Sequence, residues 1–215
     1  MQSYSSDLPK IEEFVELGGR KMLEIGCGDG RLSSLLANKV KSLTAIDPDK
    51  AMIKLACEKI SGVDFRVGYG ERLEFNDKTY DIVLFSYSLH HQDCVKALDE
   101  AKRVLRDNGI ILIIEPSTEG EYTQFVSIFQ DDEINRLNTT LAYIKFCNFD
   151  IIRQDVYFVN YDFKDDKELY YHFMDSFGIE TDGGALEKMK AMLGNKKSAR
   201  PVTIKDKVNI IFLEF

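Results

Sequence analysis

Apolar residues follow two patterns along this chain, short continuous runs and longer stretches in which they recur every three or four positions. The runs have the length of strands, and the longer stretches place apolar side chains on one face of a helix. The runs predict seven strands, at Lys21–Ile25, Ser42–Ile46, Val63–Val67, Tyr80–Phe85, Ile110–Ile114, 151–161 and Val202–Phe215. In the first half they alternate with helices, which predicts right-handed βαβ units and a parallel sheet.

The predicted helices have recognisable ends. The first spans Leu8–Leu17, with Asp7 as its N-cap. Another begins at Pro48, because the first turn of a helix does not need the N–H that proline lacks. A helix after the fourth strand stops at Asn108-Gly109. Segments 117–149 and 165–193 are predicted to be helical, and periodicity leaves the order of the last two strands open.

Composition is that of a folded, acidic protein. The 215 residues include 28 Lys and Arg against 36 Asp and Glu, and 44% are hydrophobic. The net charge of −8 disfavours nucleic acid as a partner and an anionic membrane as a docking surface, because both require basic residues. No linker or repeat divides the chain, so a single domain over residues 1–215 is expected.

The cysteines and the N-terminus indicate a cytoplasmic protein. The four cysteines contain no CxxC pair, which disfavours a zinc site, a redox dithiol and a disulfide framework, so reduced thiols are expected. Residues 1–10 lack the regions of a signal peptide, and no apolar run reaches the length of a membrane span.

Charge is unevenly distributed. From Ala185 to Lys207, seven basic residues stand against two acidic ones, a local net charge of +5 in an acidic chain. A solvated helix and loop are expected there. The alternative is a docking patch for an acidic partner or RNA.

A glycine loop follows the first strand. Gly26, Gly28 and Gly30 allow a tight turn and a close approach of backbone to ligand, beside the free N–H groups of the next helix. A dinucleotide fingerprint would place the third glycine at position 31, which is Arg31. The acid Glu24 before the loop suits a cationic ligand better than a pyrophosphate.

Four motifs in order resemble those of the class I S-adenosylmethionine-dependent methyltransferases, specifically the type 11 group that includes ubiquinone/menaquinone-type enzymes. They are Glu24–Gly30, Ala45–Asp49, Asp81–Ser86 with Leu89–His91, and Arg103–Pro116. The resemblance implies a Rossmann-like, doubly wound α/β sheet of seven strands, mostly parallel, with an antiparallel C-terminal strand. It also implies an N-terminal helix in residues 1–20, a cofactor-binding half in 21–116, and substrate-side helices and last strands in 117–215.

The resemblance implies S-adenosyl-L-methionine as the cofactor. The backbone of Gly26, Cys27 and Gly28 would contact its methionine moiety. Glu24 would hold the loop or reach the amino group, and the carbonyl of Ser86 would face that amino group.

The adenosine part would meet a second set of residues. Asp47 would bind both ribose hydroxyls, and Pro48 would lie against the adenine. The family commonly has an aspartate that binds the adenine amino group where this chain has Tyr69. Contacts there would come from the backbone of Gly70 and from Tyr69, Glu71 or water.

His90 and His91 are the candidates for catalysis. They follow the fourth strand, near the expected methyl group, and either could act as a general base, with His90 preferred. The alternative is that they cap the helix that starts near Asp93 or pack beneath the loop. An N-terminal tyrosine, Tyr4, is a possible partner by resemblance. No metal site is expected, because side chains of adjacent residues diverge.

The predicted function is methyl transfer to a small-molecule acceptor, on oxygen, nitrogen or carbon, mainly by positioning. Glu115 ends the fifth strand where an acceptor often approaches, or is only a loop anchor. Two aromatic clusters form either acceptor walls or core, in segments 122–146 and 157–177. A non-catalytic S-adenosylmethionine-binding regulatory or scaffold protein is the first alternative, and a nicotinamide-dependent oxidoreductase is the second. The run Phe85–Ser88 lacks the motif of DNA amino-methylating enzymes.

Overall fold

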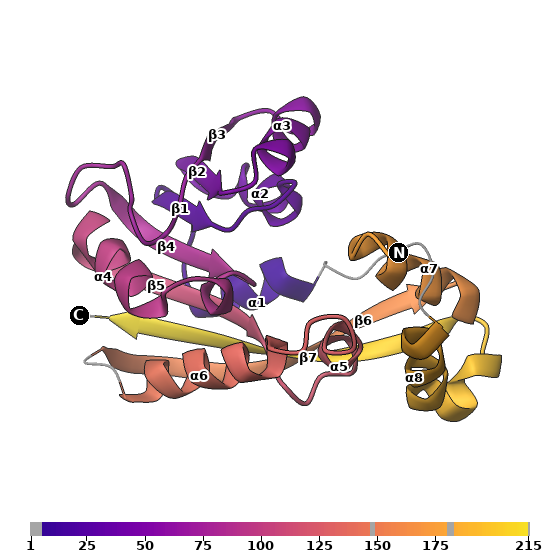
Figure 1. Ribbon diagram of the computed structural model, residues 1–215. Coiled ribbons are helices and arrows are strands. Elements are labelled where there is room, and N and C mark those ends of the chain that lie inside the picture. The colour runs from indigo at the N-terminus through magenta and orange to yellow at the C-terminus, as the bar shows by residue number, and fades with distance from the viewer. Residues whose placement is uncertain (1–5, 147–148, 180–182, 215) are drawn as a thin grey trace.

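A computed structural model describes residues 6–146, 149–179 and 183–214. It contains a seven-stranded sheet in the order β3-β2-β1-β4-β5-β7-β6 (Figure 1). The strands are β1 (Lys21–Ile25), β2 (Ser42–Asp47), β3 (Val63–Val67), β4 (Tyr80–Ser86), β5 (Leu105–Pro116), β6 (Asp150–Phe163) and β7 (Val202–Glu214). Only β7 runs antiparallel to its neighbours β5 and β6, so the predicted fold class is confirmed.

Helices cover both faces of the sheet. They are α1 (Asp7–Phe14), α2 (Arg31–Leu36), α3 (Lys50–Lys59), α4 (Cys94–Val104), α5 (Glu121–Val126), α6 (Glu133–Phe146), α7 (Asp166–Ser176) and α8 (Gly183–Leu193), with 3-10 turns η2 (Leu89–His91) and η3 (Gly194–Ser198). One core cluster joins α1, α2, α5, α7 and α8 to the sheet, and a second joins α4 and α6 to the opposite face. In the centre of the sheet, β4 and the Ile110–Ile114 part of β5 are almost entirely apolar, as strands covered on both faces must be.

The parallel register brings four strand ends to one edge. Ile25 of β1 is level with Ile46 of β2 and Phe85 of β4, and Ser86 is level with Ile114 of β5. The chain order reverses between β1 and β4, which is where ligands bind in sheets of this kind.

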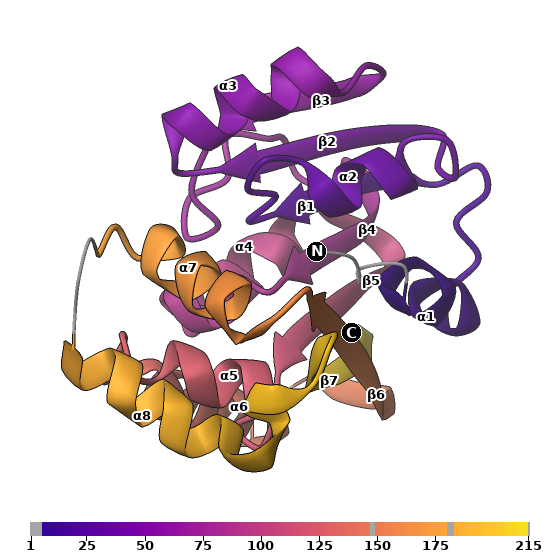
Figure 2. The ribbon, with the colours of Figure 1, turned by 90° about the vertical axis from the view of Figure 1, so that its right-hand side faces the viewer.

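Strands β6 and β7 form a long antiparallel pair that continues past β5. Their pairing extends to Phe163 and Val202, whereas β5 contacts β7 only as far as Val208. Helices α7 and α8 lie at the far end of this pair (Figures 1 and 2). The β6–β7 pair therefore places α7 and α8 beyond the end of β5.

Some predicted element ends are wrong. Helix α1 ends at Phe14, and Asp7 is its first residue, not its N-cap, because the buried Asp7 carboxylate binds distant groups instead. Helix α3 begins after Pro48, with Asp49 as its N-cap. Helix α4 ends at Val104, so β5 starts at Leu105 and includes the residues predicted to stop the helix.

The basic C-terminal segment is largely ion-paired. Lys190, Lys196, Arg200 and Lys207 each lie within 3.1 Å of a carboxylate oxygen. Their charges are thus directed at acidic neighbours on the protein itself. Separately, none of the helices in the described ranges is long and apolar enough to cross a membrane.

Candidate functional site

The glycine loop adopts the backbone that its sequence requires. Gly26, Gly28 and Gly30 have φ values of 80°, 53° and 82°, in the left-handed region that favours glycine. The amides of Gly26 and Cys27 both donate to the carbonyl of Ile46, at 2.8 and 3.0 Å. The loop is therefore held against the end of β2.

Asp47 lies opposite this loop at the end of β2. Its Oδ2 accepts from the Gly28 amide at 2.9 Å, and its Oδ1 accepts from the Asp49 amide at 2.8 Å. A carboxylate has about four acceptor positions, so both oxygens remain able to accept from a ligand. The amides orient the carboxylate toward the pocket that it lines.

Glu24 is fully buried beneath the loop. It accepts hydrogen bonds from Ser33 Oγ at 2.5 Å and from Ser86 Oγ at 3.0 Å, joining α2 to β4. Burial raises the pKa of Glu24 to about 7, although both serine hydroxyls oppose the shift. Of the two roles considered for Glu24, holding the loop is the one its contacts match, since it is not among the pocket-lining residues.

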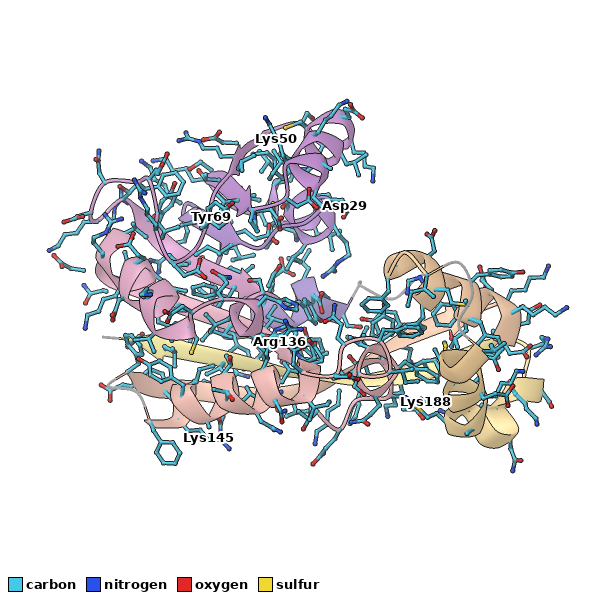
Figure 3. All side chains as sticks on the ribbon, in the orientation of Figure 1. Asp29, Lys50, Tyr69, Arg136, Lys145 and Lys188 are labelled. Atoms are coloured by element: carbon cyan, nitrogen blue, oxygen red, sulfur yellow. The ribbon has the colours of Figure 1, made fainter. Side chains whose placement is uncertain are left out.

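A pocket of about 860 Å³ opens at these strand ends. It is lined by Gly26, Cys27, Gly28, Asp47, Pro48, Gly70, Glu71 and Ser86, which are the predicted cofactor-binding residues other than Glu24. Figure 3 shows Asp29 and Tyr69 on the β1–β3 side of the molecule and Arg136 below them. The structure therefore brings the predicted residues to one cavity.

His90 is enclosed by two carboxylates. Its Nδ1 binds Glu115 Oε2, and its Nε2 lies 3.2 Å from Glu133 Oε1. Burial opposes the charge on His90, but the hydrogen bond to Glu115 and the negative charges of Glu115 and Glu133 outweigh it and raise its pKa to about 9. Glu115 also accepts from the Leu89 amide at 2.7 Å, so it fixes the whole η2 turn.

His91 is exposed and lines the pocket. The pocket walls still keep water from much of the imidazole ring. This desolvation and the neighbouring charge of His90 lower the pKa of His91, which favours the neutral form. The centroids of the His90 and His91 rings lie 3.9 Å apart. The expectation that these adjacent side chains diverge is therefore wrong. Neither histidine caps α4, because Asp93 does so by accepting from the Lys96 amide. Tyr4 lies outside the described residues.

Comparisons with known proteins agree with this geometry. Residues 23–113 match the family described as "Methyltransferase domain". This segment, which is less than half of the chain, is similar to methyltransferase domains. The chain is 37% identical over 113 residues to phthiotriol/phenolphthiotriol dimycocerosates methyltransferase 1 of Mycobacterium ulcerans, covering 49% of this chain and 41% of that protein. It is 28% identical over 108 residues to demethylmenaquinone methyltransferase of Thermotoga maritima, covering 49% and 47%.

The matched segments thus span less than half of either relative. The fold likeness is broader. A crystal structure from Bacillus halodurans C-125 has a TM-score of 0.71 and covers 97% of this chain and 98% of that one, at 18% identity. The likeness in fold therefore includes the second half of the chain, which the family match does not cover.

That second half closes the pocket. Tyr122, Tyr161 and Phe177 line it, whereas other members of the two aromatic clusters, such as Phe125 and Phe173, are core and do not line it. Tyr122 stacks on Tyr161 with 4.2 Å between ring centroids. Some aromatic residues are thus core alone, whereas Tyr161 belongs to the core and also lines the pocket.

Several pocket residues were missed by sequence reasoning. Arg31 and Tyr87 both bind the buried Asp7, at 3.0 Å each, and Glu133 reaches the site from α6. Their partners are far apart in sequence, so no local signal identifies them. Asp206 is different, because it is an acid within an apolar row of β7 and could have been noticed.

Proposed function

We propose that this protein binds S-adenosyl-L-methionine in the pocket and transfers its methyl group to a small-molecule acceptor. The observation that carries the proposal is that one cavity joins the glycine loop and Asp47 to the histidine turn and the aromatic wall. A cofactor and an acceptor can therefore meet in it. Its volume is within the usual range for such sites, roughly 300–1,000 Å³.

The residues present fit this cofactor. The pocket is lined by Asp29, Asp47 and Glu71, whereas Arg31 is the one lysine or arginine in its lining and is paired with Asp7. An acidic cavity suits a cationic ligand. The backbone at Gly26, Cys27 and Gly28 would hold the methionine part, Asp47 the ribose, and Pro48, Gly70 and Glu71 the adenine side, with Ser86 at the amino group.

Positioning is the main catalytic task. The sulfonium supplies the reactive methyl group, and alignment of the acceptor contributes roughly 7–11 kcal/mol. His90 and His91 are the proposed catalytic residues. His91, exposed in the pocket and favoured in its neutral form, takes a proton from an acceptor that must lose one. His90, held by Glu115, fixes the turn and contributes its charge.

S-adenosylmethionine is expected to raise the melting temperature. At 100 times its Kd a ligand stabilises the folded state by about 2.7 kcal/mol, which for a chain of this size is roughly 5–10 °C. Thermal shift measures this, with NAD as the control ligand that should have no effect. An unchanged melting temperature with S-adenosylmethionine would contradict the proposal. Binding without turnover of any acceptor would instead support the regulatory alternative.

His90→Ala is expected to slow turnover by about 10²-fold, because the turn that positions His91 for proton transfer loses its anchor to Glu115. The Kd of S-adenosylhomocysteine should stay within about threefold, since His90 does not contact the glycine loop. Turnover is measured with the first acceptor found by mass-spectrometric screening, and Kd by calorimetry. Normal turnover in the variant would remove His90 from the catalytic residues.

A further inference from the structure

The acceptor end of the pocket contains a buried carboxylate with no basic partner. Asp206 is 2% exposed and lies in a row of β7 whose other members are Val202, Ile204, Val208 and Ile210. Among the described residues, no Lys, Arg or His nitrogen forms an ion pair with it. The neighbouring Lys207 directs its ammonium group to Glu119, at 2.5 Å.

The contacts of Asp206 orient it without neutralising it. Oδ1 accepts from the Thr123 amide at 3.2 Å, and both oxygens lie 3.3 Å from Thr123 Oγ1. Gly120 leaves room for it, because a Cβ there would lie 1.8 Å from Oδ1. Burial raises the pKa of Asp206 to about 6, which still leaves it mostly ionised at neutral pH. The Lys207 and Tyr122 amides also donate toward the carboxylate, so all of its donors among the described residues are neutral dipoles and its charge has no counter-charge there.

The surroundings of Asp206 in the pocket are aromatic. Tyr122, Tyr161 and Phe177 line the same cavity. Tyr122 is held in place by its stacking on Tyr161 and by a 2.8 Å hydrogen bond between its hydroxyl and His172 Nε2. Aromatic rings beside a carboxylate are the usual recognition elements for ammonium groups. The other acid at this end, Glu133, is already paired with His90 and Arg136.

We infer that the acceptor carries a cationic amine, protonated or quaternary, which binds to Asp206 beside Tyr122, Tyr161 and Phe177. The inference rests on the proposed function and names its substrate class. An anionic acceptor would be repelled by Asp206, and a neutral one would leave this buried charge without a counter-charge, which is costly. The inference concerns how the acceptor is anchored. The methylated atom can be the nitrogen of the amine or an atom of another group.

Matched probe pairs test the inference on the unmodified protein. Choline and 3,3-dimethylbutan-1-ol have the same shape and differ in charge, and 2-phenylethylamine and 2-phenylethanol form a second pair. Each is titrated calorimetrically into protein saturated with S-adenosylhomocysteine. The cation of at least one pair should bind about tenfold more tightly than its neutral counterpart, because it alone is attracted by the Asp206 charge and by the faces of the aromatic rings. Equal affinities within both pairs, or no binding of either cation, would overturn the inference.

Variants locate the effect. Asp206→Asn keeps the shape and an acceptor for Thr123, and should reduce the preference for the cation to less than about threefold. Asp162→Asn, on the exposed side of β6, removes a carboxylate that does not line the pocket and should leave the preference unchanged. If Asp206→Asn does not fold, the probe pairs on the unmodified protein still decide. Failure of S-adenosylhomocysteine to bind would count against the proposed function, and its binding without cation preference against the inference alone.

Discussion

Gly26→Ala is expected to lower the free energy of unfolding by about 3 kcal/mol and to weaken S-adenosylhomocysteine binding by roughly tenfold or more. Gly26 has φ of +80°, where an L-residue is strained, and a Cβ there would lie 2.1 Å from Ser88 Cβ. Ser88 cannot move freely, because its hydroxyl donates to the Ile25 carbonyl at 2.6 Å. The glycine loop and the histidine turn would therefore be forced apart. Urea unfolding and calorimetric titration measure the two effects.

Gly19→Ala is the matched control for this substitution. Gly19 has φ of +76°, but no atom lies within 4 Å of the position its Cβ would take. It also does not line the pocket. We expect only the backbone strain, about 1 kcal/mol, and an unchanged Kd. If the two variants lost equal stability and Gly26→Ala still bound the ligand normally, the close approach of the two loops would not matter.

The predictable part of the site is the part specified by local backbone geometry. Gly26, Gly28 and Gly30 permit the positive φ angles of the loop, and Asp47 is the last residue of β2. Both features depend only on a few consecutive residues at the end of one strand, so they can be recognised in the sequence. The parallel sheet is predictable for a similar reason, because a short helix can join strands in only one hand.

The rest depends on contacts between distant residues. Asp7 looked like an N-cap, but Tyr157, which is 150 positions away, binds its carboxylate at 2.7 Å. His90 resembled a free general base until Glu115 and Glu133 were placed on both sides of it. A pattern of single residues carries no information about such partners. Asp206 shows what sequence can still reveal, since a lone acid in an apolar alternation indicates a buried charge.

Glu24→Gln is expected to make stability depend less on pH. The pKa of Glu24 is about 7 in the folded protein, against an ordinary value of 4.5 in the unfolded chain, so the folded state holds this proton more tightly than the unfolded state does. This group therefore favours folding most below pH 4.5, and its contribution is lost as pH rises from 4.5 to 7. The loss amounts to about 3 kcal/mol at pH 8, because each pKa unit corresponds to about 1.4 kcal/mol.

Glutamine stays neutral at every pH and keeps an amide oxygen that can accept from Ser33 or Ser86. The variant should thus match the unmodified protein near pH 4.5 and exceed its free energy of unfolding by up to about 3 kcal/mol at pH 8. Urea unfolding at pH steps from 4.5 to 8 measures the difference, in which other titrating groups cancel. Glu74→Gln, at an exposed position, is the control and should show a flat difference. A flat difference for Glu24→Gln as well would mean that the carboxylate beneath the loop ionises as freely as one in water, and that Ser33 and Ser86 compensate fully for its burial.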